Sequence, residues 1–262
     1  MKFKKRAFLM SNSPRFASFA EAVDKLPDGQ DYQERELVDV VVQKTEIFAA
    51  DQESRTPLDL NTSRVLMALG PLIGLDKINV LDFGGASGTH FFIAKQAITH
   101  GPAMKWHVLE TDQMSSTAKR LEQSGLRFFS NLYDATENMK RIDLIIASGA
   151  LQFCDDPLGV LRNLLDLSPR FLFITRTPLI RDSEPWYSIQ TSRLSENGPG
   201  PLPLGFKDRM VSYPISFALE SSFQNLISER YLIRFSLDEG VYGENFKSVR
   251  SCGYFCELKP GS

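Results

Sequence analysis

The chain has 262 residues, of which 42% are hydrophobic and 24% are charged, and its formal net charge is −2. This composition is typical of a soluble globular protein with a sizeable core, and the charge gives no reason to expect a nucleic-acid surface. No apolar run reaches the roughly 20 residues of a transmembrane helix, and residues 7–10, after a basic start, are too few for a signal peptide. We therefore expect a cytoplasmic protein without a membrane span.

Three helices are predicted before the first strand. Apolar residues recur at helical spacing from Phe16 to Leu26, from Tyr32 to Asp51 and from Val65 to Ile73, and a glycine closes the third helix. We expect residues 1–76 to form an N-terminal helical extension and residues 77–262 to form the main domain.

Strands and helices then alternate, a pattern that indicates a parallel sheet with helices on both faces. Strands are predicted at residues 78–83, 105–110, 126–129, 142–147, 171–174, 231–235 and 253–258. Helices are predicted at residues 89–99, 115–124, 157–165 and 216–228. The predicted fold class is α/β, with a Rossmann-like, seven-stranded, mostly parallel sheet.

Residues 178–214 interrupt this alternation and contain six prolines. A connection of this length inside a compact domain is usually functional, and its prolines favour a shaped loop over a flexible linker. We predict an insertion that borders the binding site, because it follows the fifth strand directly.

Residues 78–90 run from an apolar strand through a glycine-rich turn into a helix. The turn lacks the Lys-Ser or Lys-Thr pair of a phosphate-binding P-loop, and it has other residues where a dinucleotide fingerprint needs its second and third glycines. It does match the loop that binds S-adenosylmethionine (SAM), D-x-G-x-G-x-G. Asp82, Gly84 and Gly88 are in place, and Ala86 is the one departure.

Two acidic residues support SAM as the cofactor. Asp82, at the tip of the first strand, suits the ammonium of SAM and would repel a pyrophosphate. Glu110 ends the second strand, 22 residues after Gly88. An acid at about this spacing hydrogen-bonds ribose hydroxyls in nucleotide-binding α/β folds.

The run from Val80 to about Pro178 resembles a class I SAM-dependent methyltransferase. More narrowly, the segments LDFGG (81–85), SGALQF (148–153), TRTP (175–178) and SYP (212–214) resemble a bacterial group of methyltransferases associated with lipopolysaccharide or other surface-polysaccharide biosynthesis. The resemblance implies an antiparallel pair of strands at the sheet edge and helices beside the SAM pocket. It also implies methyl transfer to a small-molecule or glycan acceptor, with a sugar hydroxyl as the expected target.

Candidate cofactor residues follow the strands, because the carboxyl ends of parallel strands meet at one edge of a sheet. They are Asp82, Gly84, Gly85, Gly88, Glu110, Thr111, Ser130, Asn131, Ser148 and Gly149. By resemblance, Ser130 and Asn131 lie near adenine, and Ser148 and Gly149 lie beside the methionine end.

The catalytic candidates are His90, Arg176 and Gln152. A hydroxyl acceptor loses its proton during attack, and His90, directly after the turn, is the histidine best placed to act as the base. Arg176 can pair with a phosphate or carboxylate of the acceptor, and Gln152 is a further acceptor-binding candidate. The remaining histidines, His100 and His107, are interpreted as structural.

Trp186 and Tyr187 are the candidate substrate-binding residues of the insertion, because aromatic side chains stack on sugar rings. Cys154, Cys252 and Cys256 form no disulfide framework. Cys252 and Cys256 are interpreted as core residues rather than metal ligands, and no metal site is predicted.

Two other classes of protein stay open. An NAD(P)-binding oxidoreductase would share the fold but not the glycine pattern. A non-catalytic binding module would explain the sparse set of acid–base residues. The sequence indicates no oligomeric state.

Overall fold

The computed structural model describes residues 14–27, 30–51, 60–98, 101–181, 184–242 and 249–261. His100 and the basic residues at the start of the chain lie outside these ranges. None of the helices within the ranges combines the length and the apolar composition that crossing a bilayer requires.

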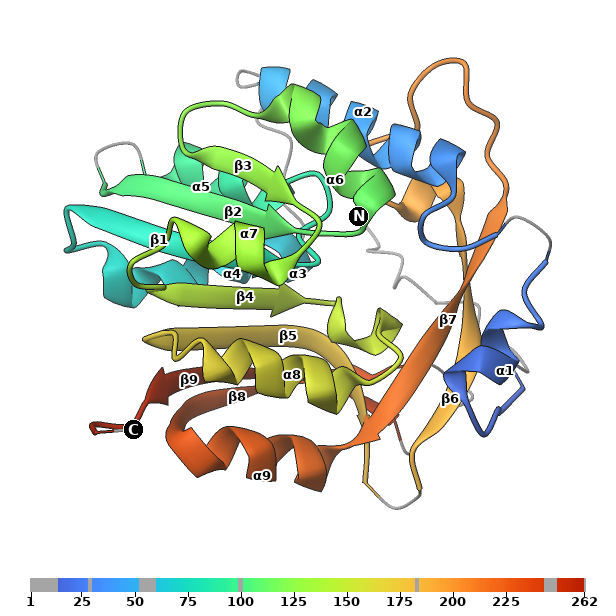
Figure 1. Cartoon of the computed structure of the whole chain (residues 1–262). Helices are drawn as coiled ribbons and strands as arrows, with labels where there is room; N and C mark the ends of the chain where they lie inside the picture. The colour runs from blue at the N-terminus through green and yellow to red at the C-terminus, as the bar shows by residue number, and fades with distance from the viewer. Residues whose placement is uncertain are drawn as a thin grey trace, which may run out of the picture.

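Seven strands form the predicted sheet, in the order β3-β2-β1-β4-β5-β9-β8 (Figure 1). Of these seven, β9 runs antiparallel to both of its neighbours, and the others are parallel to one another. Their bounds are Lys77–Phe83 (β1), Ala103–Leu109 (β2), Leu126–Phe129 (β3), Leu144–Ser148 (β4), Phe171–Ile180 (β5), Tyr231–Val241 (β8) and Val249–Leu258 (β9). The predicted α/β fold and its antiparallel partner at the edge are confirmed.

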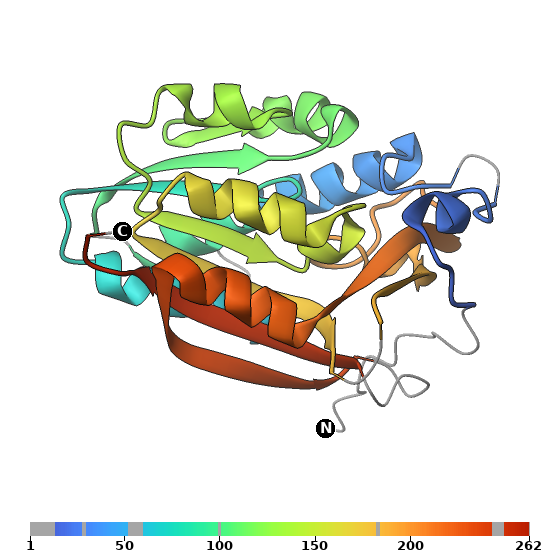
Figure 2. The same ribbon diagram turned by 60° about the horizontal axis from the view of Figure 1, so that its bottom comes forward.

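The central strands are apolar throughout because helices cover both faces of the sheet, and β4 is buried along its whole length. One face packs against α2, α4, α5 and α6, and the other against α7, α8 and α9 (Figure 2). The helices are Phe19–Val23 (α1), Arg35–Ala50 (α2), Leu60–Ser63 (α3), Val65–Leu69 (α4), Thr89–Ala97 (α5), Asp112–Ala118 (α6), Leu132–Glu137 (α7), Pro157–Asp166 (α8) and Glu220–Arg230 (α9).

The N-terminal helices share their core with the sheet. Leu37 and Val38 of α2 are fully buried in the same cluster as Val80 of β1 and Phe91 of α5. The helix predicted from Val65 to Ile73 is divided into α4 and a 3₁₀ turn, Gly70–Leu72, and the short helix α3 precedes it. Proline and glycine at the start of that turn end the regular helix.

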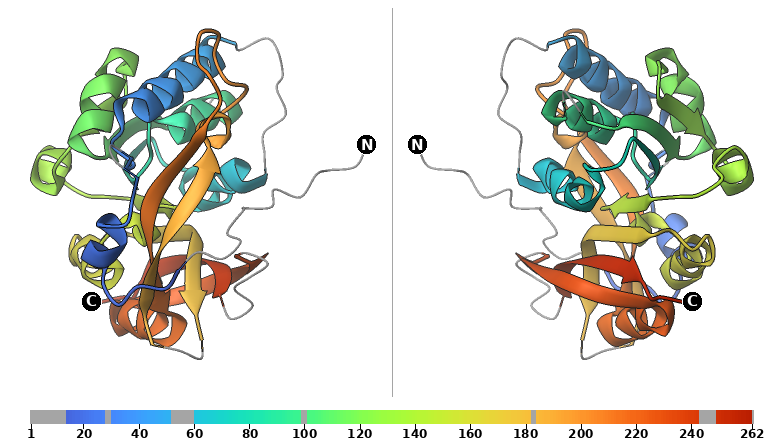
Figure 3. Two further views of the ribbon diagram at one scale, coloured as in Figure 1. Left: turned by 90° about the vertical axis from the view of Figure 1, so that its right-hand side faces the viewer. Right: turned by 90° about the vertical axis from the view of Figure 1, so that its left-hand side faces the viewer.

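The expected loop at residues 178–214 is a long β-hairpin, which corrects the sequence-based prediction. Its strands are Trp186–Arg193 (β6) and Met210–Leu219 (β7), and a 3₁₀ turn, Leu194–Glu196, follows β6. β5 continues to Ile180, past the end of β4, and its last residues pair with β7. Figure 3 shows this twisted ribbon running from α1 toward α2.

Other elements also differ from the prediction, and β8 and β9 are both longer than expected. The helix expected from residue 216 begins at Glu220, because residues 216–219 complete β7. α6 ends at Ala118, and a 3₁₀ turn takes its place up to Leu121. α7, which the sequence analysis did not predict, starts after Asn131, whose side chain accepts the N–H of Asp134.

Candidate functional site

The glycine-rich turn between β1 and α5 needs backbone angles that most residues disfavour. Gly84 has a φ of 64° and Gly88 a φ of 80°, and Ala86 between them has a φ of 49°. A Cβ on Gly84 would lie 2.2 Å from the Cβ of Ala150. Glycine at this position is therefore required for space as well as for angle, because the turn closely approaches the residues that follow β4.

Asp82 lies beneath this turn. Its side chain is 0% exposed, and a Cβ on Gly85 would lie 2.5 Å from the carboxylate. The carboxylate accepts hydrogen bonds from Nδ1 of His90 at 3.0 Å and from Nε1 of Trp106 at 3.1 Å. We expected Asp82 to face the ammonium of a cofactor. The structure corrects this placement, because the carboxylate is enclosed and holds His90 instead.

Glu110 holds the turn from the neighbouring strand. Its Oε1 accepts the N–H of Ala86 at 2.9 Å, and its Oε2 accepts the N–H of Thr111 at 2.9 Å. Burial raises the pKa of Glu110 to about 7, although the two N–H donors act in the opposite direction. A half-buried carboxyl that titrates near neutrality thus stands beside the loop.

Two adjoining cavities open at the carboxyl ends of the parallel strands. The Glu110 cavity has a volume of about 510 Å³ and is lined by Glu110 and apolar side chains of α1. The Arg176 cavity has a volume of about 390 Å³ and is lined by Arg176, His90 and polar side chains of β6. The residues that line both cavities are Tyr32, Gly84, Gly149, Phe153 and Tyr213.

The structure brings most of the expected cofactor residues to these cavities. Those that line one or both are Gly84, Gly85, Glu110, Thr111, Ser130, Ser148 and Gly149. The other three, Asp82, Gly88 and Asn131, do not line them. A Cβ on Gly88 would face the Phe128 ring at 3.2 Å, and the Asn131 side chain is used to cap α7.

All three catalytic candidates line the Arg176 cavity. Because Nδ1 of His90 donates to the Asp82 carboxylate, Nε2 is the nitrogen left to accept a proton. Gln152 is 5% exposed, and its Oε1 has no hydrogen-bond partner among the described residues.

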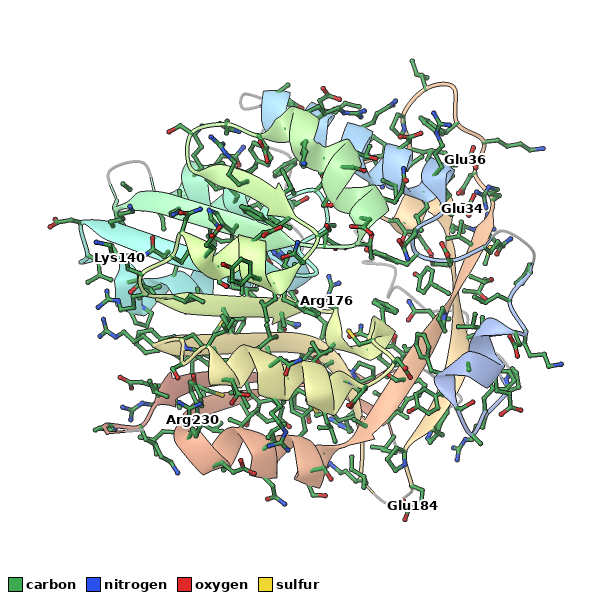
Figure 4. The ribbon with its side chains drawn as sticks, viewed as in Figure 1. Glu34, Glu36, Lys140, Arg176, Glu184 and Arg230 are labelled. Carbon is green, nitrogen blue, oxygen red and sulfur yellow. The ribbon has the colours of Figure 1, made fainter. Side chains whose placement is uncertain are left out.

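Arg176 is placed by an irregularity in β5. The residue has a φ of 58°, and the pairing register of β5 with β9 shifts between Ile174 and Thr177. Glu239 of β8 accepts the backbone N–H of Arg176 at 2.7 Å. A bulge of this kind changes the direction in which a side chain points. Figure 4 shows Arg176 beside the ends of the central strands.

Trp186 and Tyr187 do not line either cavity, which corrects the expected place of the two aromatic residues. Trp186 is 6% exposed and stacks on Phe217, with 4.0 Å between ring centroids. Tyr187 packs edge-on against Phe19 of α1. Both residues begin β6, whereas the cavity meets the other end of that strand.

β6 and β7 line one side of the Arg176 cavity with polar side chains that were not predicted from the sequence. The Tyr242 hydroxyl donates to Oε1 of Gln190 at 2.5 Å, and Nε2 of Gln190 donates to the Tyr213 hydroxyl at 3.3 Å. Oγ of Ser192 lies 3.0 Å from the same hydroxyl. The sequence contained a signal for this surface, because polar residues alternate along β6: Ser188, Gln190 and Ser192 share one buried face.

Neither a family model nor a curated protein matches this chain. Among solved structures, a SAM-dependent methyltransferase from Clostridium acetobutylicum is 13% identical, with 82% of this chain and 98% of the other covered and a TM-score of 0.47. A SAM-bound amino pentose methyltransferase from Micromonospora echinaspora is 11% identical, with 82% and 96% covered and a TM-score of 0.47.

A further solved structure, a magnesium protoporphyrin IX methyltransferase from Synechocystis, contains S-adenosylhomocysteine (SAH). It is 11% identical, with 85% of this chain and 100% of the other covered and a TM-score of 0.47.

Proposed function

We propose that this protein is a SAM-dependent methyltransferase whose acceptor is a small molecule or a glycan. The proposal rests on the contact between the carboxyl ends of β1 and β2. The glycine-rich turn closes over Asp82, and the Glu110 carboxylate binds the turn through the N–H of Ala86. Glu110 lines a cavity at the end of β2, where an acid can accept hydrogen bonds from ribose hydroxyls.

The same contact argues against an NAD(P)-binding oxidoreductase. A pyrophosphate binds such a turn through its free N–H groups. Here the N–H of Ala86 is already bonded to a carboxylate, which repels an anion and attracts the net positive charge of SAM.

When bound, SAM supplies an electrophilic methyl group on its sulfonium. The task of the chain is then to align the acceptor and to remove a proton. We assign base function to Nε2 of His90, since Asp82 fixes the other ring nitrogen and stabilises the protonated ring. The hydroxyl and amide groups of Gln190, Ser192 and Tyr213 suit the hydroxyls of a sugar ring.

The resemblance of the SGALQF and TRTP segments supports a role in surface-polysaccharide biosynthesis, with a sugar hydroxyl as the methylated group. A cytoplasmic location stays a prediction, as does the acceptor-side role of residues 178–214. For that role the structure favours Gln190, Ser192 and Tyr213 over Trp186 and Tyr187, because the former line the Arg176 cavity.

Calorimetric titration of the full chain with SAM, SAH and NAD tests the cofactor. We expect SAM and SAH to bind and NAD not to bind. Tight NAD binding without SAH binding would reverse the assignment.

Turnover distinguishes an enzyme from a non-catalytic binding module. Radiolabelled methyl transfer from SAM to a panel of sugars, nucleotide sugars and glycan fragments is the measurement. SAH binding without transfer to any member of a broad panel would favour the binding module.

A further inference from the structure

Among the residues that the structure describes, the guanidinium of Arg176 has no counter-ion. Its side chain is half-buried and lines the cavity, yet it has no ion pair or side-chain hydrogen bond among the described residues. Arg64, which lines the same cavity, is by contrast paired with Glu239 at 2.6 Å. A cation held partly out of water without a partner is unfavourable, so the arrangement calls for an anion from outside the chain.

One carboxylate that lines the same cavity, that of Glu239, is already engaged. Glu239 is 4% exposed and accepts the backbone N–H of Arg176, the hydroxyls of Thr175 and Ser251, and the guanidinium of Arg64. These four donors use the acceptor capacity of the carboxylate. Glu239 therefore fixes the backbone of Arg176 and leaves its guanidinium unneutralised.

Two features of the backbone determine where the guanidinium of Arg176 lies. Arg176 has a φ of 58° at the β5 bulge, an angle that non-glycine residues seldom adopt. Opposite, a Cβ on Gly149 would lie 2.4 Å from Nη2 of Arg176. A strained residue that persists because its surroundings hold it is characteristic of binding sites.

The cavity offers a second unused group. Oε1 of Gln152, in a side chain that is 5% exposed, has no partner among the described residues and lines the cavity with Arg176. Nε2 of the same side chain contacts the carbonyl of Arg176 at 3.4 Å, so the two residues are neighbours. A ligand bound here can neutralise the arginine and donate a hydrogen bond to the glutamine.

We propose, building on the methyltransferase function above, that the acceptor carries a carboxylate or phosphate group and that this anion binds the guanidinium of Arg176. The planar donor fork of arginine matches both anions in geometry. Arg176 is thus a specificity-determining residue of the acceptor site. The methionine carboxylate of SAM is the competing source of the same chemistry, and the experiment separates the two.

The first measurement uses small anions as probes, so that the shape of the acceptor does not matter. Protein saturated with SAH and labelled with ¹⁵N is titrated with acetate, with inorganic phosphate and with the neutral isostere acetamide at constant ionic strength. The Nε–H signal of Arg176 is assigned by its loss in Arg176→Lys. We expect saturable shifts with acetate and phosphate but not with acetamide. An Arg176 signal that responds to none of the three, or equally to all, overturns the proposal.

The second measurement identifies the source of the anion. Arg176→Gln should bind SAH and 5′-methylthioadenosine, which lacks the amino-acid part, as tightly as wild type. A loss of about tenfold or more for SAH alone would assign the methionine carboxylate to Arg176 and overturn the proposal. If wild-type protein binds neither ligand, the proposed function fails instead, whatever the anions do.

Two control variants complete the design. Arg162→Gln removes an exposed guanidinium of α8 and should leave the anion response and the melting temperature unchanged. Arg176→Gln should melt at or above the wild-type temperature, because it removes an unpaired cation. Arg64→Gln should melt lower, because it breaks the ion pair with Glu239. A drop in Arg176→Gln as large as in Arg64→Gln would make Arg176 structural and overturn the proposal.

Discussion

Glu110 is subject to two opposing effects on its protonation. It holds the N–H of Ala86 as an anion, yet burial raises its pKa to about 7. For a carboxyl whose pKa is raised in the folded state, the stability contribution is full below the unfolded pKa and is lost as the pH rises through the folded value. Between pH 5 and pH 8, ionisation of Glu110 should therefore destabilise the free protein and favour ligands whose hydroxyls donate to the carboxylate.

Glu110→Gln should remove this dependence on pH. From pH 5 to pH 8, wild type should lose on the order of 1–3 kcal/mol of stability that the variant retains. Over the same range, wild type should bind 5′-methylthioadenosine more tightly with rising pH, and the variant should not. Denaturation and calorimetry at both pH values give the comparison, and a wild-type affinity that is flat with pH contradicts the ribose assignment.

His90 is distinguished from other polar residues of the cavity by its contact with Asp82. His90→Gln should lower kcat by about 10²- to 10⁴-fold, the usual contribution of a general base, with SAH affinity unchanged. The pH–rate profile should also lose its acidic limb. Full turnover in the variant would mean that the acceptor atom reacts without help from this base.

At the scale of the elements, the two ends of β6 have different roles. Its first residue, Trp186, packs among Phe217, Ile215 and Val249, whereas Gln190 and Ser192 line the cavity. Trp186, Gln190 and Ser192 share one face of β6, because alternate side chains of a strand point to the same side. Their position along the strand then decides which of them pack in the core and which line the cavity.

Trp186→Ala should therefore act on stability. Removing a buried tryptophan typically costs about 3–5 kcal/mol, and we expect SAH affinity to stay near wild type at a temperature where the variant is folded. Chemical denaturation and calorimetry measure the two quantities. Normal stability with lost acceptor turnover would return Trp186 to the substrate-binding role.

At the scale of the whole molecule, the site forms where α2, the sheet and the β6–β7 hairpin meet. Lys44 of α2 is 2% exposed and donates to the carbonyls of Ser195 and Asn197 at 2.8 and 2.6 Å. Arg209, which directly precedes β7, donates hydrogen bonds to the carboxylates of Glu34 and Glu36. Figure 4 labels these two glutamates at the start of α2. The helix thereby positions the segment that contains Asn197, which lines the Arg176 cavity.

Lys44→Met keeps the length of the side chain but leaves two carbonyls without their donor. We expect a loss on the order of 2 kcal/mol in stability and faster hydrogen exchange in residues 195–199. Lys95→Met, at an exposed lysine of α5, is the matched control and should change neither. Unaltered exchange in Lys44→Met would show that the hairpin holds its place without α2.

Much of this organisation is local in the chain and could be predicted from it. The strand–turn–helix unit around Gly84 and the acid at Glu110 depend on short-range patterns of apolar residues, glycines and spacing. The alternation of strands and helices similarly determined the parallel sheet, because apolar strands of this kind need helices on both faces. The hairpin at residues 178–214 escaped prediction, since its inward face is polar and its prolines favour turns.

What only the tertiary structure decided is how charges are paired. Asp82 and Arg176 both lie near the carboxyl ends of predicted strands at the binding edge, so the sequence predicts the same exposure for each. In the structure, Trp106 and His90 enclose Asp82, whereas Glu239, from a strand more than 60 residues later, holds only the backbone of Arg176. The environment of a charged side chain depends on neighbours that are distant in sequence. A buried charge that has a partner contributes to the fold, whereas a buried charge without a partner remains available to a ligand.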